Sequence, residues 1–181
     1  MHEMQWFNPP AQWQASPQGL EVQVDARTDF WRVTRHDFIK DDAHFYYRSV
    51  SGDFRAEVTV HGAYQALYDQ AGLMLRQDER TWLKCGIEFL EGVQQASAVL
   101  TREFSDWSIV PLPDNPAAIR IQVLRIGSAV EVSFARLGQD FVLIRQGYLT
   151  PAPTLQVGMM CAAPQGEGFA VRFTDFSLSA L

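Results

Sequence analysis

Residues 69–76 read DQAGLMLR and residues 82–89 read WLKCGIEF. Every second residue of both stretches is apolar, which is the pattern of a β-strand that turns one face to a hydrophobic core. A short polar cluster, QDER at residues 77–80, separates the two stretches and is typical of a turn. We therefore expect an antiparallel hairpin whose two strands share one apolar face and one polar face.

The same alternation recurs along the rest of the chain. It is clearest in residues 20–24, 54–60, 119–123, 130–134 and 169–173. No stretch of a dozen residues keeps the 3.6-residue period of a helix. Many short strands within 181 residues predict an all-β fold, a two-sheet antiparallel jelly-roll sandwich, as a single domain spanning residues 1–181. Sandwiches of this kind commonly bend one sheet into a concave face that can hold a ligand.

Composition and charge narrow the classes of partner. The chain has 15 Lys and Arg against 21 Asp and Glu, a formal net charge of −6, so its surface repels a phosphate backbone and no nucleic acid partner is expected. We expect no membrane partner, because no stretch approaches the about 20 apolar residues of a span, and no secretory signal. Cys85 and Cys161 lie in apolar runs and are expected to be buried free thiols, although one disulfide is also compatible with the sequence. The predicted location is the reducing cytoplasm.

The polar face of the predicted hairpin gathers side chains suited to ligand binding. They are Gln70, Arg76, Trp82, Lys84 and Glu88. Gly72 and Gly86 on the same face would leave room for a ligand to approach the backbone. Sugars are recognised by aromatic rings together with carboxylates, amides and cations that bond several hydroxyls. The alternative is that these are ordinary outward-facing sheet residues with weak surface ion pairs.

Two further groups of residues are candidates to extend this surface. In residues 44–50, alternation sets His44 and Tyr46 on one face, and in residues 101–108 a strand end and turn are expected to place Arg102 and Trp107 at a rim. We therefore include His44, Tyr46 and Arg102 among the candidate ligand-binding residues. The alternative is that the aromatic side chains belong to the core and that residues 101–108 form a loop on the sandwich edge.

Four separated motifs, taken in order, resemble a known family. They are residues 68–76 (YDQAGLMLR), 82–89 (WLKCGIEF), 101–108 (TREFSDWS) and 161–169 (CAAPQGEGF). The resemblance is to uncharacterised proteins, a domain of unknown function with the concanavalin A-like lectin/glucanase fold, among which some fungal members are called regulation of enolase proteins. A weaker similarity is to the C-terminal sandwich domain of some bacterial β-xylosidases. The resemblance implies the fold and a general association with sugars, and it implies no catalytic residues.

The sequence carries no recognised signature of catalysis or metal binding. Jelly-roll glucanases place Glu-x-Asp-x-x-Glu on one strand, whereas Leu90 stands two residues after Glu88. Lys84 beside Glu88 is expected to keep that carboxylate ionised, which disfavours a role as an acid. We predict no catalytic residue, no metal site and no cofactor. Loop acids such as Asp41, Asp42 and Asp175 leave a structural Ca²⁺ open.

Three functions are compatible with these patterns. The first is a non-catalytic protein that binds a carbohydrate or another small polar ligand on the concave face. The second is a sugar-active hydrolase or isomerase that uses Glu88. The third, suggested only by the name of the fungal members, is an interaction protein that modulates a metabolic enzyme. The oligomeric state is open, because exposed edge strands can pair across a two-fold axis.

Overall fold

Two seven-stranded antiparallel sheets make up most of the computed structural model, which describes residues 4–181. Sheet I has the strand order β1 (Gln5–Phe7), β6 (His44–Ser51), β15 (Thr154–Ala162), β8 (Gln70–Arg76), β9 (Thr81–Leu90), β10 (Val93–Arg102) and β11 (Phe104–Leu112). Sheet II has the order β14 (Val142–Tyr148), β13 (Ala129–Arg136), β12 (Ile119–Ile126), β7 (Phe54–Gly62), β16 (Ala170–Ala180), β3 (Gly19–Gln23) and β2 (Gln12–Ser16). The remaining strands, β4 (Phe30–Arg32) and β5 (Ile39–Asp41), pair only with each other.

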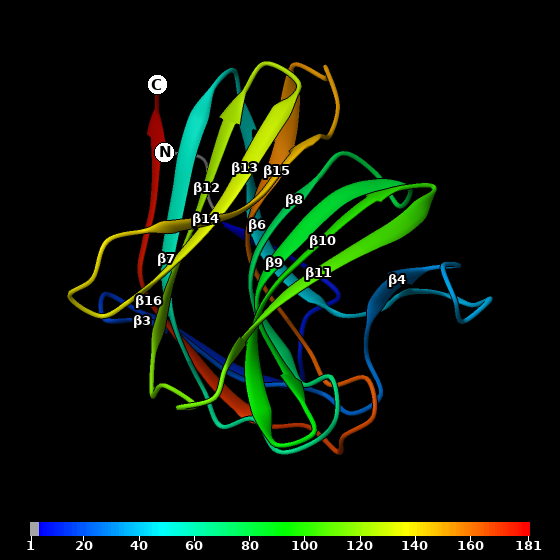
Figure 1. Cartoon of the computed structure of the whole chain (residues 1–181), viewed down its shortest axis with the longest axis vertical. Coiled ribbons are helices and arrows are strands. Elements are labelled where there is room, and N and C mark those ends of the chain that lie inside the picture. Colours follow the sequence, from blue (N-terminus) through cyan, green and yellow to red (C-terminus); the bar gives the residue numbers. More distant parts are fainter. Residues whose placement is uncertain (1–3) are drawn as a thin grey trace.

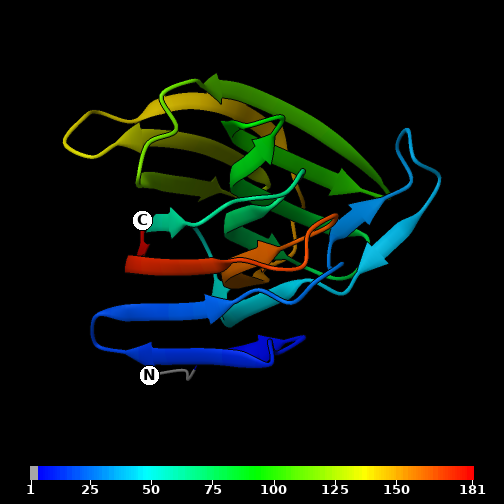
Figure 2. The same ribbon diagram turned by 90° about the horizontal axis from the view of Figure 1, so that it is seen from below.

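The sheets pack face to face, and the β4–β5 hairpin stands beside them (Figure 1, Figure 2). This arrangement confirms the predicted all-β, two-sheet jelly-roll sandwich with the concanavalin A-like fold. Residues 4–181 contain no helix that is long and apolar enough to cross a bilayer.

The predicted hairpin is confirmed as β8 paired with β9. Leu75 lies opposite Leu83 and Leu73 opposite Cys85, and these side chains are buried in the core between the sheets. The core is completed by apolar residues of sheet II, including Val58, Ile121, Val132 and Phe173. Both cysteines are buried free thiols. The alternation of apolar residues therefore predicts correctly which face of β8 and β9 meets the second sheet.

Gly72 and Gly86 lie directly opposite each other at the centre of sheet I. A Cβ atom added to Gly72 would lie 1.9 Å from the carbonyl oxygen of Cys85, and one added to Gly86 would lie 2.1 Å from that of Ala71. The close approach of β8 and β9 therefore requires both glycines. Their lack of side chains also lowers the outer face of sheet I at this point.

The β4–β5 hairpin covers part of the outer face of sheet I, the face turned away from sheet II. Phe30, fully buried, packs with Trp82, Met74 and Met160 of that face in a second, smaller apolar cluster. The hairpin tip, residues 33–38, is closed by a hydrogen bond from the Val33 amide to the Phe38 carbonyl (2.8 Å). Thus the outer face is not an open groove, because the hairpin base occupies one end of it.

Candidate functional site

A cavity of about 320 Å³ lies between the outer face of sheet I and the tip of the β4–β5 hairpin. Three of its lining residues, Asp29, Lys84 and Glu88, are charged and buried. Two larger hollows, of about 670 and 740 Å³, lie over β2, β3 and β16, but no charged residue that lines them is buried. Burying charge is costly unless it is paired or used. We therefore treat the smaller cavity, here called the hairpin cavity, as the candidate site.

Lys84 is the cation at the base of the hairpin cavity. Its ammonium group donates hydrogen bonds to Oδ1 of Asp29 (3.1 Å) and to the carbonyl oxygen of Phe30 (2.6 Å). Its side chain is 5% exposed, and that of Asp29 is 12% exposed. The ammonium has three N–H donors, so one remains after these two bonds. Lys84 thus ties the start of the hairpin to β9 and offers a single donor to the cavity.

Glu88 lies on the same face of β9 four residues after Lys84, beyond Gly86, and is opposite Gln70. Its Oε2 accepts hydrogen bonds from the Ser97 hydroxyl (2.9 Å) and from the Trp107 indole N–H (2.8 Å). Burial raises the pKa of Glu88, and the opposing effects of Lys84, Ser97 and Trp107 do not cancel this effect. Lys84 lowers the pKa of Glu88, as expected, but burial has the larger and opposite effect, so the expectation that this pair disfavours an acid role is not supported.

Several polar atoms at the base are not used by the protein itself. Among residues 4–181, no donor bonds to Oε1 of Glu88, to Oδ2 of Asp29 or to Oε1 of Gln70. The Gln70 side-chain amide instead donates to the Tyr68 carbonyl oxygen (3.1 Å). These oxygens are all hydrogen-bond acceptors. The cavity therefore presents a base that is rich in acceptors and poor in donors.

Aromatic side chains form the walls of the hairpin cavity. Trp31, His36 and Phe38 come from the hairpin, with ring centroids 5.9 Å apart for Trp31 and His36 and 5.8 Å apart for His36 and Phe38. Trp107 comes from β11, and Tyr68 from the segment that precedes β8. Flat rings around a polar base suit a ligand that has both apolar faces and hydroxyl groups.

The structure brings three of the predicted site residues into this cavity, namely Gln70, Lys84 and Glu88. Arg76 and Trp82 share the same face of sheet I, as predicted, but the hairpin base covers them and they are 5% and 1% exposed. Arg76 donates two hydrogen bonds to the Asp41 carboxylate, at 2.7 and 2.8 Å. In the described part of the chain, these two residues therefore pack and hold the hairpin and do not line the cavity.

The structure places His44, Tyr46 and Arg102 away from the cavity. His44 pairs with Cys161 across β6 and β15, so it lies on the inner face of sheet I, where its Nε2 accepts a hydrogen bond from the Asp25 amide (3.1 Å). Tyr46 lies on the same inner side and packs against the core. Arg102 follows the core residues Ala98 and Leu100 on the inner face of β10, and its guanidinium group lies 5.0 Å from the ring centroid of Tyr148. The expectation that they join the outer surface is therefore not met.

Several lining residues were not selected from the sequence. Asp29, His36 and Phe38 line the cavity only because the hairpin folds back over sheet I. Trp107 was expected at a rim, and it does reach the cavity, where it bonds Glu88. The clustering of aromatic residues at positions 30–47 was the available signal, but it does not show which rings face the outer surface.

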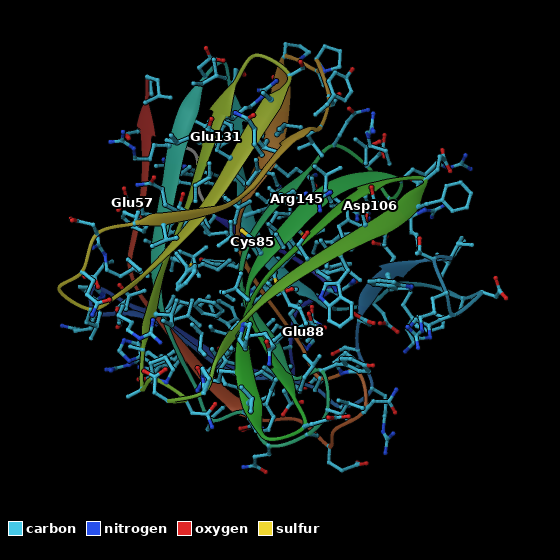
Figure 3. All side chains as sticks on the ribbon, in the orientation of Figure 1. Glu57, Cys85, Glu88, Asp106, Glu131 and Arg145 are labelled. Atoms are coloured by element: carbon cyan, nitrogen blue, oxygen red, sulfur yellow. The ribbon has the colours of Figure 1, made fainter. Side chains whose placement is uncertain are left out.

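Figure 3 shows Glu88 on sheet I, well apart from Glu57 and Glu131, which belong to strands of sheet II. It also shows Arg145 and Asp106 near each other where β14 and β11 approach, and their closest N–O distance is 4.0 Å. Within residues 4–181, no three His, Cys, Asp or Glu side chains are gathered in a way that could hold a metal ion.

Comparison with known proteins finds relatives along almost the whole chain. The model of the family described as "Protein of unknown function (DUF1349)" matches residues 6–181. The chain is 35% identical over 178 residues to the protein named "Regulation of enolase protein 1" of Saccharomyces cerevisiae, covering 97% of this chain and 88% of that protein. A crystal structure of a functionally unknown protein from the same yeast is 32% identical, with a TM-score of 0.94 over 98% of this chain and 96% of that one.

More distant solved structures share the fold. The GH43 protein BlXynB of Bacillus licheniformis has a TM-score of 0.75 at 15% identity, with 98% of this chain matching 37% of that one. The carbohydrate binding module CBM66 of Bacillus subtilis has a TM-score of 0.61 at 12% identity, with 97% of this chain matching 95% of the module.

Proposed function

We propose that this chain, a member of the DUF1349 family of proteins of unknown function, binds a small ligand in the hairpin cavity. The ligand is a carbohydrate or another small polar molecule, and the protein does not transform it. The observation that carries the proposal is the set of buried Asp29, Lys84 and Glu88 beneath aromatic walls. The oxygens of Glu88, Asp29 and Gln70 that no donor of the protein bonds are accessible from the cavity, so a ligand that carries hydroxyl groups can bond them. The fold shared with a carbohydrate binding module is compatible with it.

A titration of the purified protein with neutral monosaccharides tests this proposal. The readouts are the melting temperature and the tryptophan emission, because the Trp107 indole bonds Glu88 inside the cavity. Ligand binding to the native state raises the melting temperature by mass action. We expect Glu88→Gln to abolish the response and Glu131→Gln to retain it, since Glu131 bonds Gln146 on sheet II instead. A response that survives Glu88→Gln would place the ligand elsewhere.

A second candidate is a sugar-active hydrolase or isomerase that uses Glu88. The raised pKa of Glu88 favours it, because a buried protonated carboxyl can act as a general acid. The second carboxylate would be Asp29, which lines the same cavity. Turnover of a glycoside that persists unchanged in Glu88→Gln would exclude this role.

A third candidate follows from the name of the yeast relative, which refers to regulation of enolase. The corresponding function for this chain is binding to a metabolic enzyme, with the cytoplasm as its location. Calorimetric titration with purified enolase that shows no heat of binding, together with no co-elution on gel filtration, would count against this function. A complex that forms equally well with Glu88→Gln would show that enolase binding does not depend on the hairpin cavity.

A further inference from the structure

The hairpin cavity is closed at one end by the base of the β4–β5 hairpin. Phe30 is fully buried against Trp82, and the Asp41–Arg76 ion pair lies beside them over the outer face of sheet I. An extended ligand running across this face from Lys84 would meet these side chains. In the described part of the chain they leave no open groove in that direction.

The opposite end is bordered by two connecting segments. Tyr68 precedes β8, and Gln165 follows β15, at the ends where Gln70 pairs with Glu88 and with Ala162. The cavity between these ends, of about 320 Å³, is near the lower limit of the about 300–1,000 Å³ usual for small-molecule sites. Its size and its two borders fit one sugar ring and not a row of them.

The base also selects the charge of its occupant. It offers free acceptors on Glu88, Asp29 and Gln70, and two free N–H donors, one on the Lys84 ammonium group and one on the Gln70 amide. No arginine lines the cavity, and the charge of Lys40, the other lysine that does, is already compensated by Asp42 at 3.0 Å. A phosphate or a carboxylate would bring more acceptors to a base that already holds two carboxyl groups, whereas hydroxyl groups would supply the donors that the base lacks.

The same base argues against a cationic occupant. Lys84 already compensates the charge of Asp29 at 3.1 Å. Burial also raises the pKa of Glu88. An ammonium group would repel Lys84, whose anionic partner Asp29 is already paired.

We infer that the occupant of the hairpin cavity is one uncharged sugar ring, or a polyol of the same size, and that contacts to it do not extend along a polysaccharide chain. This inference rests on the proposed function and makes its ligand class specific. It differs from the elongated groove that the outer face of sheet I would offer without the hairpin.

The test compares matched ligands in calorimetric titrations of the whole chain. The probes are D-glucose, D-xylose, glucosamine, glucuronate, glucose 6-phosphate, cellohexaose and xylohexaose. A signal is assigned to the cavity only if Glu88→Gln weakens it at least tenfold while Glu131→Gln does not. Phe38→Ala, at a wall position that is 43% exposed, gives a second variant should Glu88→Gln fail to fold.

We expect a neutral monosaccharide to bind, the charged sugars to bind at least tenfold more weakly, and the hexaose to bind no more tightly than its monomer. A cavity-dependent affinity that rises tenfold or more from monomer to hexaose, or that favours a charged sugar, would overturn the inference and leave the proposed function in place. No cavity-dependent binding by any probe would overturn the proposed function, and the inference with it.

Discussion

The Asp41–Arg76 ion pair should be a principal attachment of the β4–β5 hairpin, and Asp41→Ala tests this. The Arg76 side chain is 6% exposed and donates two hydrogen bonds to Asp41, at 2.7 and 2.8 Å. Its guanidinium group also lies 4.6 Å from the ring centroid of Phe7 and 5.9 Å from that of Phe30. Removal of the carboxylate leaves this buried cation without its anionic partner.

The magnitude follows from burial. Breaking a buried ion pair by removing one partner costs about 3–5 kcal/mol, because an uncompensated charge remains inside the protein. This is a large part of the about 5–15 kcal/mol that stabilises most native proteins. For a chain of this size, each kcal/mol lowers the melting temperature by roughly 2–4 °C. We therefore expect Asp41→Ala to melt well below the wild type.

Urea unfolding followed by tryptophan fluorescence gives the free energy of unfolding. The matched control is Asp114→Ala, because Asp114 also accepts two hydrogen bonds from one arginine, Arg136, at 3.1 and 2.6 Å. That pair is exposed to solvent, with 34% of the Arg136 side chain and 54% of the Asp114 side chain accessible. Exposed pairs add little to stability, so the control should unfold at the wild-type urea concentration.

A double variant separates the loss of the pair from the burial of an unpaired charge. In Asp41→Ala with Arg76→Met, no charge is left under the hairpin, and we expect it to be more stable than Asp41→Ala alone. The reasoning is refuted if Asp41→Ala changes stability no more than Asp114→Ala does, or if the double variant is the least stable of the three.

Three more predictions concern the interior. Burial raises the pKa of Glu88 above its usual 4.5, so the native protein retains a proton that the unfolded chain releases. The stability of the wild type should therefore fall as the pH rises from 4.5 through the higher native pKa. Glu88→Gln, which does not titrate, should lose less stability over the same pH range in urea titrations. Burial raises the pKa of Cys85 to about 12 and that of Cys161 still further above its usual range. Neither thiol should therefore react with a disulfide reagent at pH 8 until urea unfolds the chain. Fast labelling of the native protein would contradict their burial. Gly86→Ala should prevent accumulation of folded protein, because its Cβ would lie 2.1 Å from a backbone carbonyl oxygen. Gly92→Ala, whose Cβ would meet no atom within 4 Å, should fold with a modest loss of stability. Circular dichroism and melting curves check both expectations.

The strands of the sandwich were predictable because their apolar residues alternate strictly. Leu73 and Leu83 belong to runs in which every second side chain is apolar, and both runs turn that face to the core. The same reasoning placed Lys84 and Glu88 together on the opposite face, and the structure agrees.

The β4–β5 hairpin was not predictable from the same pattern. Its strands have three residues each, and its tip holds Val33, Arg35 and Asp37 at positive φ angles of 60°, 67° and 55°. Turns with such angles are usually marked by Gly or Asn, and a β-branched residue such as Val33 gives no such signal. The cover over Arg76 therefore had no counterpart in the sequence pattern.

Face assignment failed where both faces of a strand are rich in rings. In β6, Phe45 and Tyr47 face the hairpin while His44 and Tyr46 face the inner side, so hydrophobicity does not identify the buried face. Arg102 was misplaced for a different reason, since its partner Tyr148 belongs to the other sheet. Such a contact depends on how β10 and β14 of the two sheets approach each other, which the local sequence pattern does not encode.

The strand order has a consequence for synthesis of the chain on the ribosome. β15 lies between β6 and β8 in sheet I, and β16 lies between β7 and β3 in sheet II. Neither sheet is complete until β15 and β16 have been made. Before then β3, β6, β7 and β8 each lack one neighbour. Unpaired strand edges are the usual starting points of aggregation. A nascent chain of this topology has most need of chaperones just before β15 and β16 emerge.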